Sequence, residues 1–378
     1  MEISSLEQEK QAQLALRLTA GVGDVLLRYL VSAFGSAAGV FAARPGRLEK
    51  VRGIGPGLAQ SIGHKSTFAE AETLLLRARQ EGVRLLFYTE AEYPDRLKRL
   101  YDAPVLLFYK GPADLNAPRS VAIVGTRQAT EYGKRVAEEI VESAHKHNAL
   151  IVSGLAFGID IAAHRAALRV GLPTVGVMAS GPDVIYPAAH AKTARQMAET
   201  GGILTEHPFG TQPDPRFFAA RNRIIAGMAD AIVIVESARK GGGLITAEYA
   251  NNYHREVLAV PGDLRRPLSE GCNELIRKNK ALIYTGIECL EEALNWDSDG
   301  KTTPSTRGQS ALTAALDMSQ FTNEESQVLA LLRQGVEVHV DDLAWQAQLP
   351  MGRLASLLLN LEFQGFVKTL PGKRYALE

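Results

Sequence analysis

The feature that most constrains the fold is a regular alternation between residues 119 and 287. Short apolar runs rich in β-branched residues are each followed by a stretch with helical spacing. Near-continuous apolar strands are what a parallel sheet needs when helices bury both of its faces. The alternation therefore predicts an α/β fold with a Rossmann-like, doubly wound and mostly parallel sheet. The expected strands are VAIVG (121–125), LIVSG (150–154), PTVGVMASG (173–181), ILTE (203–206), AIVIVE (231–236), VLAVPG (257–262) and ALIYTG (281–286).

The rest of the chain divides around this sheet. Residues 1–85 have the patterns of short amphipathic helices and predict a helical domain. The sheet domain is expected over residues 86–290, where 86–118 is a connector whose apolar run VLLFY we interpret as an edge strand. Residues 291–320 are small and polar at first, which is typical of a linker. Residues 321–378 give three helices and a glycine-turned hairpin, which predicts a winged helix.

Charge and cysteine content limit the ligand and the compartment. Lys+Arg and Asp+Glu are each 42, so the formal net charge is zero and a nucleic-acid ligand needs a local basic patch. Cys272 and Cys289 have no metal-ligand or disulfide spacing, and no run approaches 18 apolar residues. We therefore expect a cytoplasmic protein with no metal, no cofactor and no membrane contact.

A glycine-rich turn, Gly53-Ile54-Gly55-Pro56-Gly57, separates two of the N-terminal helices. It resembles a helix-hairpin-helix element, in which backbone N–H groups at a helix start meet a phosphate. The alternative is a plain helical turn in a small bundle. The pattern alone leaves both interpretations open.

Three loops that follow strands carry small and basic residues. They are Gly125-Thr126-Arg127, residues 153–160, and SARKGGGLIT (237–246). Parallel strands end at one edge of the sheet, small residues let a ligand approach the backbone, and helix N-termini and arginine favour phosphate. The three loops together predict an anion-binding groove, although Asp160 is interpreted as a helix N-terminal charge. The loops match neither a dinucleotide fingerprint nor a Walker A motif.

The segment RFFAARNRIIAGM (216–228) places two arginines inside an apolar helix. Helical spacing puts Arg221 within an apolar stripe, where an unpaired charge is costly, so it needs an anionic partner. Glu206 or Glu236 is one candidate partner, and a bound phosphate is the other. Arg223 lies on a different side of the helix. We favour an architectural Arg221 and a ligand-facing Arg223.

Taken together, these stretches resemble the DprA/Smf family, the DNA-processing proteins of natural transformation. The matching segments run in order over roughly residues 90 to 287: YPDRLKRLYDAPVLLFYKG, VAIVGTR, IVSGLAFGIDIAAHRAAL, GPDVIYP, FFAARNRIIAG, GGGLITAEYA, VLAVPG and GCNELIRKNKALIYTG. Members of the family often have a small helical SAM-like domain in front of the sheet and a winged helix behind it. Both flanks of this chain fit that order.

The resemblance implies a protein that binds single-stranded DNA, usually as a homodimer through the Rossmann-like domain. The family protects incoming strands and helps to load the RecA recombinase on them. Phe217 is expected either to stack on a base or to pack in the core. The implied DNA-binding residues are Gly125, Thr126, Arg127, Ser153, Gly154, Lys192, Arg216, Phe217, Arg221, Asn222, Arg223, Lys240, Gly242, Gly243 and Thr246.

The sequence departs from the family pattern in three places. Thr126 stands where serine is usual, which keeps a hydroxyl group. Phe218 stands where the family usually has proline. Ala188 stands where a basic residue is frequent, with His190 and Lys192 just beyond it. These departures put a phosphate contact from the loop around Ala188 in doubt.

An enzymatic alternative comes from related Rossmann-like proteins that cleave nucleoside monophosphates at the N-glycosidic bond. They carry a GGxGT loop followed by a catalytic glutamate. GGGLITAE supplies three glycines, Thr246 and Glu248, but Thr246 is displaced from its place in that loop and no second acid–base partner is evident. We therefore expect a binding protein and no enzyme.

The predicted winged helix has few DNA-reading residues. Its second helix, MGRLASLLLNLEFQ, offers only Arg353, and the preceding VDDLAWQ is acidic. We expect this domain to pack against a partner or its own chain. Lys368, Lys373 and Arg374 on the wing are the residues that would favour DNA instead.

Overall fold

The computed structural model describes residues 5–296, 321–334, 338–347, 349–370 and 374–377. The chain divides into two compact units, residues 1–297 and 298–378. The predicted boundary at residue 85 falls inside strand β1, so the N-terminal helices and the sheet share the first unit. The predicted linker begins inside helix α14, and its residues 297–320 lie outside the described part of the chain.

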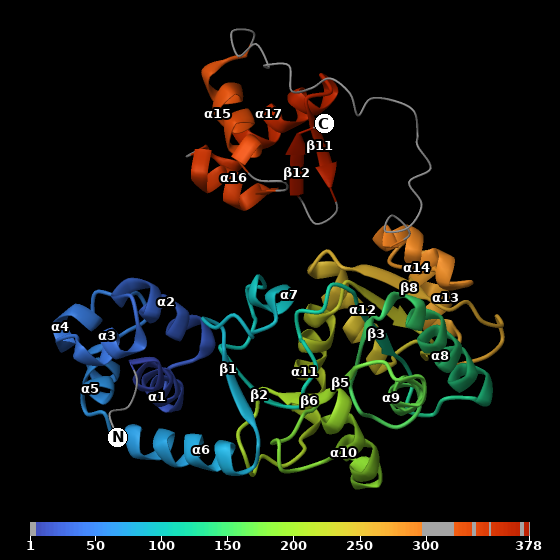
Figure 1. Ribbon diagram of the computed structural model, residues 1–378, viewed down its shortest axis with the longest axis horizontal. Helices are drawn as coiled ribbons and strands as arrows, with labels where there is room; N and C mark the ends of the chain where they lie inside the picture. The colour runs from blue at the N-terminus through green and yellow to red at the C-terminus, as the bar shows by residue number, and fades with distance from the viewer. Residues whose placement is uncertain (1–4, 297–320, 335–337, 348, 371–373, 378) are drawn as a thin grey trace. The chain divides into compact units, whose positions relative to one another are not determined.

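A nine-stranded sheet forms the centre of the first unit, in the order β1-β2-β6-β5-β4-β3-β7-β8-β9 (Figure 1). The seven strands from β6 to β9 in this order are parallel, and β2 and β1 extend one edge antiparallel. This confirms the predicted fold class. The run VLLFY lies in strand β2 but is not an edge, because β1 covers it. The strands are β1 Arg84–Phe87, β2 Leu106–Lys110, β3 Ser120–Val124, β4 Leu150–Ser153, β5 Thr174–Val177, β6 Gly202–Thr205, β7 Ala231–Ile234, β8 Glu256–Ala259 and β9 Leu282–Ile283.

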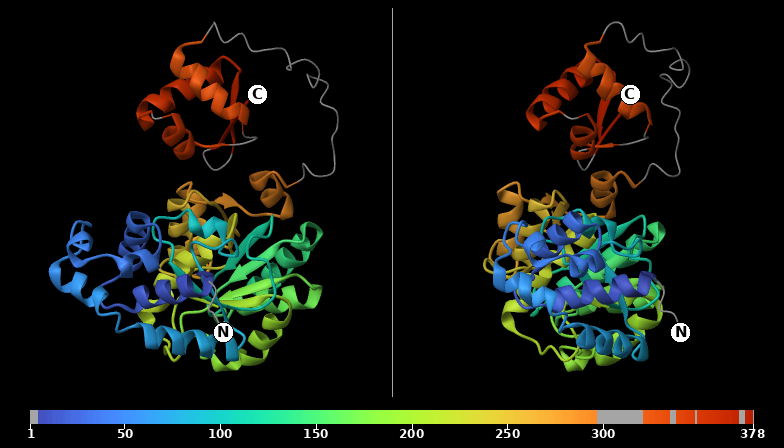
Figure 2. Two further views of the ribbon diagram at one scale, coloured as in Figure 1. Left: turned by 60° about the vertical axis from the view of Figure 1, so that its left-hand side comes forward. Right: turned by 90° about the vertical axis from the view of Figure 1, so that its left-hand side faces the viewer.

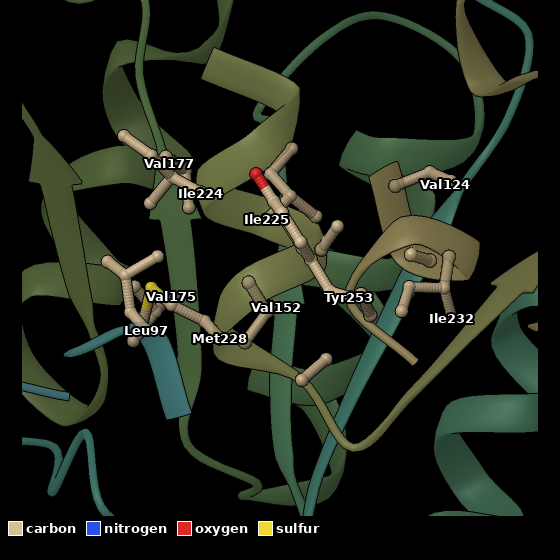
Figure 3. Packing of buried hydrophobic residues seen from close by; sticks show 14 of the residues in the cluster. Leu97, Val124, Val152, Val175, Val177, Ile224, Ile225, Met228, Ile232 and Tyr253 are labelled. Atoms are coloured by element: carbon tan, nitrogen blue, oxygen red, sulfur yellow. The ribbon is translucent and has the colours of Figure 1, made fainter. Parts of the chain in front are cut away.

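Helices bury both faces of the sheet. Along β3, Val121 and Ile123 pack under α8, α9 and α14, whereas Ala122 and Val124 pack under α11, α12 and α13. Figure 3 shows the second layer, where Ile225 and Met228 of α11 lie over the strands. This two-sided burial explains why the strands read as continuous apolar runs. The helices and 3₁₀ turns of this part are α7 Asp95–Lys98, α8 Glu131–Ala144, η1 His145–His147, α9 Ile159–Val170, η2 Ala188–His190, α10 Ala191–Thr200, α11 Pro215–Met228, α12 Gly242–Asn252, α13 Glu270–Arg277 and α14 Ile287–Leu294.

The winding direction reverses between β3 and β7, which lie side by side in the sheet. From β3 the chain proceeds to β4, β5 and β6 on one side, and from β7 to β8 and β9 on the other. Ligands of open α/β sheets bind outside the carboxyl ends of the strands at such a reversal. The loops after β3 and β7 therefore mark the expected site.

The N-terminal helices gather at the β1 end of this unit, away from α8 (Figures 1 and 2). Their apolar side chains share one core with Leu85, Phe87, Leu106 and Phe108 of β1 and β2. The helices are α1 Ser5–Leu18, α2 Asp24–Phe34, α3 Ala37–Ala42, α4 Pro45–Leu48, α5 Pro56–Gly63 and α6 Phe68–Gln80.

The glycine turn before α5 has a counterpart before α2, which the sequence pattern did not reveal. Gly21 (φ 89°) and Gly53 (φ 94°) have the same left-handed backbone. Two residues later, Gly23 and Gly55 are the N-caps of α2 and α5, with ψ of 174° and 172°. The contacts between the turns are reciprocal: a Cβ on Gly21 would meet Leu58, and a Cβ on Gly53 would meet Leu26. Residues 21–26 and 53–58 thus form a two-fold related pair.

The second unit is a winged helix, as predicted. Its described helices pack on a three-stranded sheet of order β10-β12-β11 around one apolar core. Lys373 on the predicted wing lies outside the described residues. The elements are α15 Asn323–Gln334, β10 Val338–His339, α16 Val340–Ala347, α17 Met351–Phe363, β11 Val367–Leu370 and β12 Arg374–Leu377.

Candidate nucleic-acid interface

The loops after β3 and β4 are pressed together at the carboxyl edge of the sheet. A Cβ on Gly158 (φ 80°) would lie 2.2 Å from the carbonyl oxygen of Thr126, and a Cβ on Gly125 would lie 2.6 Å from Ile159. The N–H of Thr126 donates to the carbonyl of Glu236 at 2.8 Å. Gly125 and Gly158 are therefore required for close approach of backbone to backbone.

The N-terminus of α8 is already occupied by a carboxylate. Glu236, at the end of β7, accepts hydrogen bonds from the N–H of Thr130 at 2.9 Å and from its hydroxyl at 2.6 Å. The hydroxyl of Thr130 in turn accepts from the N–H of Gly133. A phosphate would compete with this fixed negative charge, so the start of α8 is closed to an anion.

Arg221 is a buried arginine that ties three elements together. Its side chain is 4% exposed, and its Nη1 donates to the carbonyls of Gly154, at 2.6 Å, and Val177. A Cβ on Gly154 would lie 2.6 Å both from the guanidinium of Arg221 and from the carboxylate of Asp160. Burial lowers the pKa of Arg221 to about 10, and the charge of Asp160 opposes that shift. The arginine is architectural, as favoured from the sequence.

The anionic partner of Arg221 differs from both carboxylates proposed for it. The charge of Asp160 acts on its guanidinium, although the described residues show no direct ion pair between the two, whereas Glu206 and Glu236 have other partners. Burial raises the pKa of Asp160 and Arg221 opposes the rise. Asp160 is thus a buried counter-ion and not only the helix N-terminal charge expected. The sequence lacked a signal for this pairing, because the two residues are 61 positions apart.

Ser153 and Gly154, which were expected to face DNA, are internal, and Arg221, Gly243 and Thr246 of the same expected set are buried as well. Ser153 is fully buried, and its hydroxyl donates to the carbonyl of Ile123 at 2.5 Å. Gly154 is also buried and accepts from Arg221. We correct their expected role: neither reaches the surface, and Gly154 holds Arg221 through its carbonyl.

Arg223 also differs from its expected orientation. It forms an ion pair with Glu206, and its Nη1 donates to the carbonyl of Asp102 at 2.6 Å. It lies near the N-terminal helices and lines a cavity there, away from the pocket of Arg127. The expectation that Arg223 faces a ligand at the strand ends is wrong, because an internal carboxylate holds it.

Arg127 is exposed in the loop after β3, where the winding direction of the sheet reverses. Its guanidinium lies 5.0 Å from the centre of the Phe218 ring, and that ring lies 5.6 Å from Tyr186. Together with Val184, Gln212, Pro213 and Pro215, these three residues line a pocket of about 600 Å³. Phe218 and Tyr186 were missed from the sequence, where Phe218 was noticed only as a departure from proline.

The N-terminus of α12 has no side-chain cap. A Cβ on Gly243 would lie 3.6 Å from the Cα of Gly125, so the α12 start adjoins the loop after β3. Asn222 donates to the carbonyl of Gly242 at 3.4 Å and fixes this start to α11. Gly242 and Lys240 are exposed, whereas Thr246 is buried one turn further along. A helix start without a side-chain cap, such as this one, is suited to a phosphate.

Three further residues were predicted to bind DNA: Lys192, Arg216 and Phe217. Lys192 is exposed in the first turn of α10. Arg216 is exposed but forms a two-point ion pair with Asp214, the N-cap of α11. Phe217 turns to His207, with ring centres 4.3 Å apart, so Phe218 rather than Phe217 lines the pocket of Arg127.

Two negative findings apply to the described residues. They contain no group of three or more His, Cys, Asp or Glu placed to hold a metal ion. Within the same ranges, no helix has the length and apolar character that a membrane span requires.

The fold and the rim define a Rossmann-like α/β protein whose switch point carries an exposed arginine, aromatic rings and an open helix start, followed by a winged helix. Comparison with protein families places it more narrowly. The profile described as DNA recombination-mediator protein A matches residues 84–295, and the profile of the DprA winged helix domain matches residues 308–373. The chain belongs to the DprA/Smf family of DNA-processing proteins.

Individual relatives agree with this assignment. Protein Smf of Synechocystis sp. is 32% identical, and the match covers 97% of this chain and 98% of the relative. The crystal structure of DprA from Streptococcus pneumoniae is 31% identical, with a TM-score of 0.65, and covers 77% of this chain and 98% of its own. A DprA structure from Helicobacter pylori, described for its single-stranded DNA binding mode, is 31% identical with a TM-score of 0.52 and covers 57% and 96%.

Proposed function

We propose that this protein binds single-stranded DNA along the carboxyl edge of its large sheet. The observation that carries the proposal is the exposed guanidinium of Arg127 stacked on Phe218 beside the open start of α12. The relative from Helicobacter pylori, described as a single-stranded DNA binder, supports the same ligand class.

The chemistry of the rim favours a single strand over a duplex. Arg127 and the N–H groups of α12 suit phosphates, while Phe218 and Tyr186 offer ring faces to unstacked bases. Bases inside a duplex are stacked on one another and cannot use such rings. Because every base has a π-face, we expect little sequence preference.

The decisive experiment is a gel-shift assay with single-stranded and double-stranded DNA at two salt concentrations. We expect tighter binding of the single strand and a loss of affinity with rising salt, since phosphate contacts release counterions. Equal affinity for both DNA forms, or affinity independent of salt, would contradict the proposal.

The partners follow from the same proposal. The bound strand is protected and passed to the RecA recombinase during natural transformation, in the cytoplasm. RecA loading is tested by the rate of RecA filament assembly on DNA coated with single-strand-binding protein, with and without this chain. A rate that does not change would refute the loading role.

We further propose a homodimer through the Rossmann-like domain, at the β9 edge. Leu282 and Ile283 of this two-residue strand are 50% and 47% exposed, and Leu264 is more exposed still. An uncovered strand edge with apolar side chains is a pairing surface. Sedimentation of the intact chain measures the state directly.

We also propose that the protein is not an enzyme. Glu248, the residue that a nucleoside monophosphate hydrolase would use, is exposed on α12, while Thr246 of the same motif is buried. A ribose-release assay on nucleoside monophosphates tests this. Turnover that disappears in Glu248→Gln would refute the binding-only function.

A further inference from the structure

A second cavity lies within the first unit, between the paired glycine turns and the loop before β2. Its volume is about 920 Å³, larger than that of the pocket at Arg127. It is lined by Gly23, Asp24, Val25, Leu26, Arg28, Tyr29, Val51, Arg52, Gly53, Tyr101, Asp102, Ala103 and Arg223. Both turns of the two-fold pair thus contribute to one wall, and the Tyr101 loop faces them.

Two exposed tyrosines give this cavity its character. Tyr101 is 74% exposed and Tyr29 is 63% exposed. The Tyr101 ring is supported by an edge contact with Tyr253, at 6.2 Å between ring centres. Tyrosine combines a large apolar ring with a polar hydroxyl, which is why it is enriched at binding interfaces. The ring faces suit a flat, aromatic group.

The charged groups select an anionic ligand. Three arginines and two aspartates line the cavity. Asp24 pairs with Arg17, and Asp102 accepts from the hydroxyl of Tyr253. These contacts fix both carboxylates in place. Three arginines against two aspartates leave the lining with one positive charge in excess.

Two arginines carry charge that no carboxylate of the described residues pairs. Arg28 donates to the carbonyls of Leu100 and Ala103 and lies 5.1 Å from the centre of the Tyr88 ring, so its charge is held in place without a carboxylate among the described residues. Arg52 is exposed beside Gly53, and none of the described side chains is bonded to it. The guanidinium fork of an exposed arginine suits the oxygens of a phosphate.

The cavity and the rim share helix α11. Phe218 lines the pocket at Arg127, and Arg223 lines the second cavity. Five residues of helix separate their Cα atoms by about 7.5 Å along the axis. Phe217, in the same part of α11, contacts the ring of His207 in the loop after β6, and the positive charges of Arg223 and Arg17 act on His207. A polymer that leaves one pocket can reach the other around this helix.

We propose that this cavity, formed by Tyr29, Arg52 and Tyr101, binds a nucleotide of the same single-stranded DNA at a second contact point. The base stacks on the tyrosine rings, and the phosphate lies on Arg52. The proposal rests on the proposed single-stranded DNA function. It extends the DNA path from the sheet edge to the N-terminal helices.

The test uses the full chain and fluorescence anisotropy with labelled dT30. Tyr101→Ala is expected to weaken affinity by about 5- to 150-fold, the loss typical of one base stack. Tyr101→Phe keeps the ring and should bind as the parent protein does. Arg52→Ala should weaken binding and reduce the salt slope by about 1. Arg169→Ala is the charge-matched control, because Arg169 is exposed at the far end of α9 and pairs with Glu138 and Glu142.

The outcomes separate this proposal from the function on which it rests. If the parent chain does not bind dT30, the proposed function fails. If the parent binds, Arg127→Ala binds weakly, and Tyr101→Ala and Arg52→Ala bind normally, only the second contact is refuted. A loss confined to duplex DNA in these variants would refute it as well.

A second measurement does not depend on affinity. Oligonucleotides containing 5-iodouracil, crosslinked by light and mapped by mass spectrometry, should label peptides containing Tyr29 or Tyr101. Labelling only at the Phe218 and Tyr186 pocket would overturn the proposal. Because both tyrosines are exposed, variants at these positions should keep the melting temperature of the parent protein. This is checked by a thermal melt of the same protein samples.

Discussion

Replacing Arg221 with methionine tests the central structural claim about the RNR segment. Methionine keeps the apolar part of the stem but removes the charge and its hydrogen bonds. The carbonyls of Gly154 and Val177 then lose their donor, and Asp160 is left as a buried carboxylate without its counter-ion. Leaving a buried charge without compensation costs about 3–5 kcal/mol.

The assay is calorimetry on the intact chain. In a unit of roughly this size, each kcal/mol shifts the melting temperature by about 2–4 °C, so we expect the transition of the first unit to fall by on the order of 10 °C. The transition of the winged helix, a separate unit, should not move. Adding Asp160→Asn to Arg221→Met should restore part of the loss, since the uncompensated charge is gone.

The stability lost in Arg221→Met should depend on pH, and the direction of this dependence can be worked out. Burial raises the pKa of Asp160, and Arg221 opposes that rise, so the pKa rises further without the arginine. A carboxyl whose folded-state pKa lies above its unfolded value destabilises the fold at higher pH. This cost disappears as the pH falls from the pKa of the folded state to the pKa of the unfolded state. The deficit of Arg221→Met should therefore be larger at pH 8 than at pH 5. A loss below about 1 kcal/mol, or the same loss at both pH values, would refute the pairing of Arg221 with Asp160.

Three further predictions concern the surface. Arg127→Ala should weaken single-stranded DNA binding roughly tenfold and reduce the salt slope by about 1, measured by anisotropy, while Arg169→Ala should change neither. Phe218→Ala should cost about 1–3 kcal/mol of binding, and Phe217→Ala less, because only the Phe218 ring lines the pocket of Arg127; the reverse order would contradict this geometry. Leu282→Arg should convert a dimer to a monomer in sedimentation without a change in melting temperature, and a dimer that survives would exclude the β9 edge.

The alternation of apolar and amphipathic segments was sufficient to predict the parallel sheet, its helices and the winged helix. A strand buried on both faces needs apolar residues at successive positions, as in VAIVG of β3. This pattern can be recognised from neighbouring residues alone. The exposed Arg127 was also predictable, because it follows directly from a strand end. By contrast, β1 was not predicted as a strand, because the expected boundary at residue 85 divided it between the helical region and a connector with no periodic signal.

What the sequence alone determined is which residue types stand at the strand ends and that one arginine of the RNR segment had to be internal. Only the tertiary structure decided which group meets which. Arg221 and Arg223 lie about 200° apart on α11. This spacing does not predict that Arg221 lies near Asp160 and that Arg223 pairs with Glu206. Periodicity is a property of neighbours in the chain, whereas an ion pair, the two-fold match of distant glycine turns and the cavity between them depend on segments brought together by packing.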